Sequence, residues 1–290
     1  MRSNGIRYRS VCALLVASSV LVADAHAGVV RLRRMVVVGD SLLAGFGSGG
    51  FVGVGRPGQV DRAPAFIARR AHVRLPLPLI SGPGVPPPLM IVDANRNGVL
   101  DRGEVRRTSD DLGFRADADR TARNLAVPGE DTGSVFEKIS AQNIAGELIT
   151  GDVKGRDVLK FLILGLPLRA EPMSQVSRAR ALHPSFLLVW IGNNDVLDMA
   201  TDTNPGAVTL TPQEFGARVR ALLDALADTQ AGMAVANLPD PTGIAALRRA
   251  AGDVTSCRRA DGTTEAVAAD DLLSIYLART GCPLPRAPRC

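Results

Sequence analysis

Residues Val36 to Leu43 read Val-Val-Val-Gly-Asp-Ser-Leu-Leu, and this stretch decides the fold. β-branched residues favour a strand, and Gly39 permits a sharp turn where the chain leaves the sheet. Ser41 is therefore expected at the carboxyl edge of a buried strand, which is the edge where open α/β sheets bind their ligands. In the alternative interpretation, Ser41 only caps the helix that follows.

Two further sequence blocks follow, each at a predicted strand end. Residues 124–129 read Asn-Leu-Ala-Val-Pro-Gly, and residues 192–195 read Gly-Asn-Asn-Asp after an apolar run. Together with Gly-Asp-Ser-Leu at residues 39–42, they resemble, in the same order, the blocks of the SGNH family of serine esterases and lipases, also called GDSL hydrolases. One block alone recurs by chance, whereas three in order are specific. The resemblance covers roughly residues 33–284.

The resemblance implies hydrolysis of carboxylic esters through an acyl-serine intermediate. Ser41 Oγ would attack the acyl carbon, and the N–H groups of Ser41 and Gly129 with the side-chain amide of Asn194 would hold the oxyanion. The alternative for Gly129 is a plain turn glycine, and for Asn194 a helix cap. Lipid, acetylated-glycan and small aryl esters all suit such a site, because a fold alone does not choose among substrates.

The catalytic base is missing from this pattern. The family supplies it from an Asp-x-x-His block near the C-terminus, and the 3 histidines of this chain, His26, His72 and His183, occupy no such block. We therefore expect a C-terminally incomplete domain that lacks the final strand and helix, and an esterase that is inactive or weak. The alternative class is a non-catalytic secreted module that binds an acyl or glycan ligand beside a calcium-ordered loop.

The order of predicted elements indicates the fold class. Strands are predicted near residues 34–38, 123–127, 186–191 and 233–237, with helical stretches between them, one of them at residues 61–72. This alternation predicts a three-layer α/β/α fold with a parallel sheet and helices on both faces. Such an architecture is flavodoxin-like and agrees with the resemblance to SGNH hydrolases.

The clearest helix begins at Thr211 and Pro212, because threonine caps a helix and proline suits its first position. One apolar stripe at helical period marks its core-facing side: Phe215, Val219, Leu222, Leu223 and Leu226. This stripe indicates core packing and no ligand site.

A second motif lies in an insertion at about residues 75–108, which begins with a proline-rich stretch that excludes regular structure. The sequence from Asp93 to Glu104 fits the EF-hand calcium loop at every ligand position. The predicted Ca²⁺ ligands are Asp93, Asn95, Asn97, Val99 through its carbonyl, Asp101 and Glu104. Prolines stand where an EF-hand has its incoming helix, so we expect a structural role for Ca²⁺ and no cofactor for catalysis. The alternative is a polar loop built from Asx turns.

The N-terminus has the pattern of a secretory signal. Three arginines precede the apolar stretch of residues 11–23, and Ala-His-Ala at residues 25–27 suits a cleavage site. We expect a signal peptide at residues 1–27, a mature domain at residues 28–290 without a stable membrane span, and a secreted or periplasmic bacterial protein. The alternative is an uncleaved anchor, although a membrane span requires about 20 apolar residues.

The net charge limits which partners are expected, and the cysteines indicate whether a disulfide forms. The net charge of +5 comes from arginines scattered along the chain without a dense basic run, so nucleic-acid binding is not indicated. Export favours a disulfide between Cys257 and Cys282, which would contribute roughly 3 kcal/mol in the chain-entropy model. The alternative is two unpaired thiols. Residues 45–50 satisfy a dinucleotide-binding glycine pattern, but these glycines start six residues past Gly39, and no strand pattern leads to the acidic residue Asp61.

Overall fold

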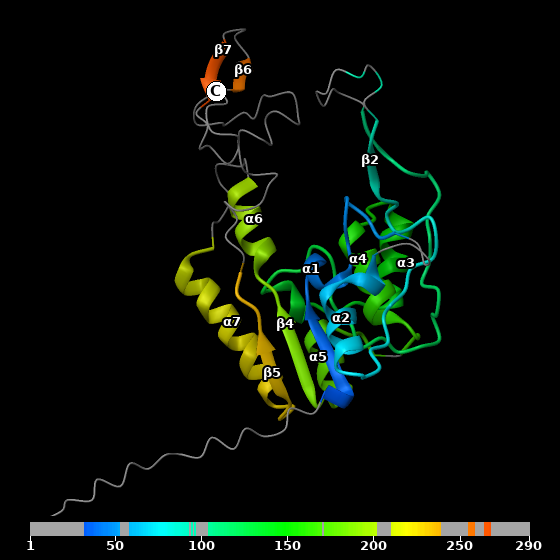
Figure 1. The fold of residues 1–290 in the computed structure, drawn as a ribbon, viewed down its shortest axis with the longest axis vertical. Helices are drawn as coiled ribbons and strands as arrows, with labels where there is room; N and C mark the ends of the chain where they lie inside the picture. Colours follow the sequence, from blue (N-terminus) through cyan, green and yellow to red (C-terminus); the bar gives the residue numbers. More distant parts are fainter. Residues whose placement is uncertain are drawn as a thin grey trace, which may run out of the picture. The chain divides into compact units, whose positions relative to one another are not determined.

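A parallel sheet of three strands carries the candidate site (Figure 1). In the computed structural model these strands are β1 (Met35–Gly39), β4 (Phe186–Trp190) and β5 (Gly232–Val235), in the order β1-β4-β5. Met35 pairs with Phe186 and Gly39 with Trp190, so the carboxyl ends of β1 and β4 meet at one edge. The structure describes residues 32–52, 58–92, 94, 96, 104–169, 171–201, 210–238, 255–258 and 264–267.

The strand predicted at residues 123–127 runs beside β1 as an extended segment instead of a regular strand. Its backbone makes two hydrogen bonds with Val37, each 2.9 Å long, and Val127 N–H donates to Gly39 O at 3.0 Å. The ladder is interrupted because Gly39 N–H donates to the side chain of Gln175 instead, at 2.9 Å. The other three predicted strands are confirmed as β1, β4 and β5.

Helices connect these strands largely as predicted. α7 (Pro212–Ala227) starts at the expected position, where the Thr211 side chain caps it. The helix predicted at residues 61–72 is a short 3-10 turn, η2 (Gln59–Asp61), followed by α2 (Ala63–Arg70). The other helices of the described residues are α1 (Ser41–Ala44), α3 (Ala141–Thr150), α4 (Gly155–Lys160), α5 (Gln175–Ala181) and α6 (Asn193–Thr201), with the short turns η1 (Leu32–Arg34) and η3 (Ser134–Phe136) and the π-helical η4 (Phe161–Gly165).

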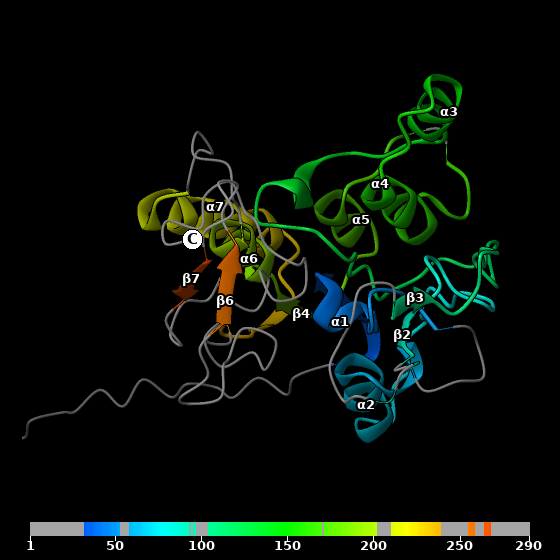
Figure 2. The same cartoon turned by 90° about the horizontal axis from the view of Figure 1, so that it is seen from above.

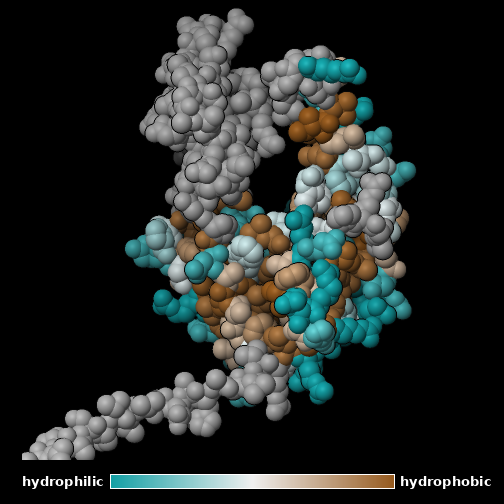
Figure 3. Space-filling model, viewed as in Figure 1, coloured by the Kyte–Doolittle hydropathy of each residue, from teal (hydrophilic) through white to brown (hydrophobic). Residues whose placement is uncertain are grey.

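The sheet is covered on both faces, which confirms the predicted α/β architecture. Figures 1 and 2 show α2 on one side of β1 and α5 on the other, and α5 also contacts α7. All residues of β1 are buried, and they form one core with Leu187 and Val189 of β4 and with Leu222 and Leu226 of α7. β5 is more exposed, and Figure 3 shows hydrophobic side chains gathered over the sheet near β4 and β5.

The calcium motif lies in a hairpin that is separate from this sheet. β2 (Leu89–Ile91) pairs antiparallel with β3 (Val105–Arg107), so a strand, and not a helix, leads into the predicted loop. Glu104 is buried, and its Oε1 accepts a hydrogen bond from Ala94 N–H at 3.0 Å. The other predicted ligands lie outside the described residues: Asp93, Asn95, Asn97, Val99 and Asp101.

A second hairpin consists of β6 (Thr255–Arg258) and β7 (Thr264–Val267), which pair antiparallel. Cys257 lies on β6, whereas Cys282 and the signal predicted at residues 1–27 lie outside the described residues. The disulfide and the signal therefore stay predictions. Among the helices that the structure describes, none is long and apolar enough to cross a membrane.

Candidate active site

Ser41 lies where the sequence predicts, as the first residue of α1 directly after β1. Its half-buried side chain has no capping role, because the N-cap of α1 is Asp40, whose Oδ1 accepts from Leu42 N–H at 2.9 Å. Gly39 is required by close packing at this turn, since a Cβ there would lie 2.4 Å from Trp190 O. The turn therefore leaves the Ser41 side chain available for chemistry at the carboxyl edge of the sheet.

The second sequence block is hydrogen-bonded to the first. Buried Asn124 donates from Nδ2 to Leu43 O at 2.8 Å, and Val127 N–H donates to Gly39 O at 3.0 Å. The block then turns at Gly129, which has a φ of 82°. A Cβ at Gly129 would meet only the Arg156 side chain at ordinary contact distance, so the backbone conformation, and not space, favours glycine here.

The third block is hydrogen-bonded to the first through Asn193, a residue to which the sequence assigned no role. Asn193 Nδ2 donates to Oδ2 of Asp40 at 2.8 Å. Asp40 is fully buried, and this burial raises its pKa above 3.8, although the hydrogen bonds from Asn193 and Leu42 N–H oppose the shift. The position of Asn193, beside Asn194 and shortly after the end of β4 at Trp190, was the only signal for this contact.

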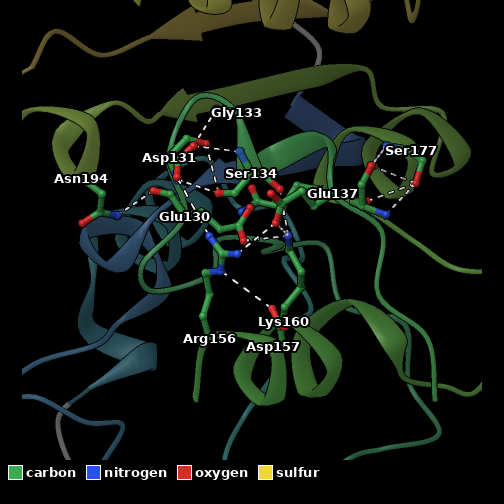
Figure 4. Close-up of polar contacts among 12 residues, drawn as sticks. Glu130, Asp131, Gly133, Ser134, Glu137, Arg156, Asp157, Lys160, Ser177 and Asn194 are labelled. Carbon is green, nitrogen blue, oxygen red and sulfur yellow. Dashed lines mark hydrogen bonds and ion pairs between the residues drawn. The ribbon is translucent and has the colours of Figure 1, made fainter. Parts of the chain in front are cut away.

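The segment directly after the second block is hydrogen-bonded to the third block (Figure 4). Asn194 Nδ2 donates to Glu130 O at 2.6 Å, which leaves the second N–H of this amide for another acceptor. Buried Asp195 accepts from Thr132 twice, from N–H at 2.9 Å and from Oγ1 at 2.5 Å. Asn194 therefore acts as a donor and does not cap α6, which already begins at Asn193.

Gln175, the first residue of α5, also binds the end of β1, in addition to the contacts that the second and third blocks make there. Its Oε1 accepts from Gly39 N–H and its Nε2 donates to Gly39 O, both at 2.9 Å, and the side chain is fully buried. A side-chain amide thus takes the place of a neighbouring strand two residues before Ser41. The sequence held no signal for this role, because a glutamine in a helix normally indicates an exposed face.

A buried ion pair follows Gly129 (Figure 4). Lys160 Nζ lies 2.9 Å from Glu130 Oε1 and donates to Ser134 O at 2.8 Å. Burial raises the pKa of Glu130 to about 7, against the opposing attraction of Lys160 and Arg156. Sequence reasoning missed this pair, because its members lie on different elements.

The histidines that the structure describes do not complete a serine–histidine pair. His183 lies three residues before β4, at the amino end of the sheet, whereas Ser41 follows the carboxyl end of β1. At about 3.3 Å per residue, the length of β4 separates the two edges by roughly 16 Å. His72 follows α2, and within the described residues no hydrogen bond joins either imidazole to Ser41. His26 lies outside the described residues.

Metal coordination has no candidate in the described part of the chain. Within the described ranges, no group of three or more His, Cys, Asp or Glu side chains is placed to hold a metal ion. Five of the six predicted Ca²⁺ ligands lie outside these ranges, so the calcium motif stays a prediction.

The three blocks thus meet at the carboxyl edge of a parallel sheet, around a serine that begins a helix. This arrangement is consistent with the α/β fold of SGNH hydrolases. A family model described as GDSL-like lipase/acylhydrolase matches residues 35–266, and the chain belongs to this family. No curated protein and no solved structure matches the chain. The resemblance inferred from the three sequence blocks is therefore confirmed at the level of the family.

Proposed function

We propose that this chain is a secreted carboxylic ester hydrolase in which Ser41 forms the acyl-enzyme. The observation that carries the proposal is the set of hydrogen bonds that joins the first block to the other two and the residue after Gly129 to the third block. Gly39 is bonded to Val127, Asp40 to Asn193, and Glu130 to Asn194. These contacts hold the segments that bear Ser41, Gly129 and Asn194 against one another, as a preorganised oxyanion site requires.

The proposed reaction proceeds in two halves. Ser41 Oγ attacks the acyl carbon, and the N–H groups of Ser41 and Gly129 with the Asn194 amide hold the oxyanion. The ester C–O bond then breaks, and the alcohol leaves with a proton. Water attacks the acyl-serine, the acid is released, and Ser41 regains its proton. Lipid, acetylated-glycan and small aryl esters are the proposed substrate classes.

We further propose that hydrolysis by this sequence is weak. An activated serine needs a base within hydrogen-bond reach, and no Asp-x-x-His block is present in residues 1–290. Loss of a triad member in a serine protease leaves about 10³–10⁴-fold catalysis over water, which derives from the oxyanion hole and substrate binding. Residual turnover of that order is the expectation for this chain.

The test is hydrolysis of p-nitrophenyl acetate by the purified chain beside Ser41→Ala. Ser109→Ala is the matched control, because Ser109 lies in an exposed loop where it accepts from Asp111 N–H. We expect slow hydrolysis that Ser41→Ala abolishes and Ser109→Ala preserves. Equal rates for the chain and Ser41→Ala would refute an acyl-serine mechanism. Rates typical of a complete triad would instead show that the expected weakness is wrong.

The second candidate function is a non-catalytic module that binds an acyl or glycan ligand. It is favoured by one observation, that within the described residues no imidazole is hydrogen-bonded to Ser41. Calorimetric titration with an acetylated xylo-oligosaccharide separates the two functions. Saturable binding without release of acetate supports the module, whereas acetate release that depends on Ser41 supports the hydrolase.

We also propose that the loop between β2 and β3 binds Ca²⁺ in a structural role. The EF-hand ligand pattern supports this proposal. So does the hydrogen bond that Glu104 Oε1 accepts from the N–H of Ala94, the second residue of the loop. A Kd of about 10⁻⁴–10⁻³ M is typical of extracellular modules. Calcium titration followed by calorimetry should show such binding in the native chain and its loss in Glu104→Gln, with Asp110→Asn as control. Equal binding by Glu104→Gln would contradict the assignment.

Export is proposed from the N-terminal pattern. Expression in a bacterium with a Sec pathway, followed by mass spectrometry of the product, should give a mature protein that begins at Gly28. A product that retains residues 1–27 in the membrane fraction would indicate the uncleaved anchor instead.

A further inference from the structure

Glu130 is a buried carboxylate directly after the turn glycine of the second block. Its side chain is 0 % exposed, and that of its partner Lys160 is 1 % exposed. In the described part of the chain, no backbone amide, hydroxyl or side-chain amide donates to its carboxylate. Buried ion pairs of this kind are often no more stabilising than an apolar pair of similar volume. The pair therefore calls for a role beyond stability.

The backbone of Glu130 connects the two segments predicted to hold the oxyanion. Its N–H donates to Val127 O at 3.2 Å, which closes the turn that contains Gly129. Its carbonyl accepts from Asn194 Nδ2 at 2.6 Å. A displacement of Glu130 would therefore move both Gly129 and the Asn194 amide.

The side chain of Glu130 is held by Lys160, on the side away from Asn194. Figure 4 shows its carboxylate facing Lys160 at the end of α4, while its backbone carbonyl faces Asn194. Lys160 Nζ also donates to Ser134 O at 2.8 Å, so one ammonium group joins Glu130 to η3. The turn is thereby fastened to α4 on one side and to α6 on the other.

We propose that Glu130 is a positioning residue whose ionised carboxylate, paired with Lys160, holds the Gly129–Glu130 turn in the conformation that presents the Gly129 N–H and the Asn194 amide to the oxyanion. The chemical part of this inference rests on the proposed function of Ser41. The structural part, a link between the charge of Glu130 and the geometry of the turn, stands without it.

The charged groups around Glu130 determine how this link depends on pH. Lys160 and Arg156 face it from α4 and favour its ionised form, whereas Asp131, the next residue, opposes it. Glu137, the residue after η3, lies 3.9 Å from Lys160 Nζ and competes for its charge. Because burial raises the pKa of Glu130 to about 7, the ion pair forms above about pH 7 and is lost below it. The turn is therefore fastened at neutral to alkaline pH and released in acid.

The test uses the full chain labelled with ¹⁵N and followed by NMR from pH 5 to 9. We expect the Gly129 backbone amide and the Asn194 side-chain amide to shift together with a midpoint near pH 7. Glu130→Gln should remove this transition. Glu137→Gln, which changes a carboxylate that is 58 % exposed beside the same lysine, should preserve it. If Glu130→Gln does not fold, Glu130→Gln with Lys160→Met removes both charges and should also give a flat profile.

Two results would overturn the inference. One is the absence of a transition at both amides in the native chain, and the other is its persistence in the Glu130 variants. Ester hydrolysis is measured in the same samples. Where it is detectable, Glu130→Gln should lower kcat about ten- to a hundredfold with KM within about twofold, since full loss of an oxyanion donor costs about 10²–10³. If hydrolysis is independent of Ser41, the proposed function fails and the NMR titration still decides the role of Glu130.

Discussion

Asn193 Nδ2 lies 2.8 Å from Asp40 Oδ2 and joins the third sequence block to the residue before Ser41, across 153 positions of the chain. Asp40 uses its other oxygen, Oδ1, to cap α1 through Leu42 N–H. One buried carboxylate thus holds the start of the helix that bears Ser41 and the start of α6. The aspartate of the Gly-Asp-Ser-Leu block is therefore a structural acceptor in this chain.

The first prediction concerns this contact. Asn193→Ala leaves a fully buried carboxylate without one of its donors, and hydrogen bonds to charged groups contribute about 1.5–3 kcal/mol. We expect a loss of that size in the free energy of unfolding, measured by urea denaturation. Asn237→Ala, at an exposed position after β5, should change it by less than about 0.5 kcal/mol. A double-mutant cycle with Asp40→Ala should show coupling between the two residues, and additive losses would contradict a direct interaction.

The second prediction concerns Gln175. Gln175→Met keeps the volume and the apolar stem but removes both hydrogen bonds to Gly39, so the buried Gly39 N–H loses its acceptor. Such an orphaned donor costs about 1–3 kcal/mol. We expect lower stability in urea and faster amide exchange at residues 39–41. Gln142→Met, on an exposed position of α3, is the control and should match the native chain. Unchanged exchange at residues 39–41 would show that the amide bridge does not hold the strand end.

The third prediction is a pH dependence of stability with a defined sign. The pKa of Glu130 is about 7 in the folded chain and 4.5 ordinarily, so between these values the folded state binds more protons than the unfolded state. The stability from this group is full below about pH 4.5 and is lost as pH rises through about 7, by about 3 kcal/mol in total. Urea unfolding at pH 5 and pH 8 should show this decline in the native chain.

The matched variant for this prediction is Glu130→Gln, which cannot titrate. Asp40 has a raised pKa as well, but it is present in both proteins, so its contribution cancels in the comparison. The difference in stability between pH 5 and pH 8 should therefore be larger in the native chain than in the variant. The same difference in both proteins would mean that Glu130 does not carry the linkage.

The core elements could be predicted because their signals are local. The run Val36–Val38 is apolar throughout since β1 is buried on both faces, and Thr211 with Pro212 marks the start of α7 by capping chemistry alone. Positions of Gly39, Ser41 and Gly129 follow from the same kind of local reasoning. The segment at residues 123–127 was harder, because its pairing with β1 is interrupted by a side chain from α5.

The polar contacts around the site could not be predicted, because they join residues that are far apart in the sequence. Gln175 bonds Gly39 across 136 positions, and Lys160 meets Glu130 only because α4 packs against the turn. Sequence patterns record which face of an element is apolar, but they do not record which distant backbone group a buried amide or ammonium will meet. Burial of Glu130 and Lys160 also contradicts the usual exposure of charged residues, so no pattern rule selects them.

The last prediction separates the cost of breaking the buried ion pair from its net contribution. Lys160→Met removes the attraction that lowers the pKa of Glu130, so this pKa rises further and the buried carboxyl binds a proton at pH 8. Protonation one pH unit above the native pKa of about 7 costs about 1.4 kcal/mol. At pH 5 the carboxyl of Glu130 is protonated, because its pKa is about 7 even beside Lys160, and the loss should be much smaller. Adding Glu130→Gln to Lys160→Met should restore most of the stability at pH 8.

Lys138→Met is the control for this prediction. It changes an exposed lysine near the same loop and should have little effect at either pH. Urea unfolding of these variants at both pH values measures all of these quantities. A Lys160→Met loss that is equal at pH 5 and pH 8 would mean that Glu130 is not the group whose charge Lys160 balances.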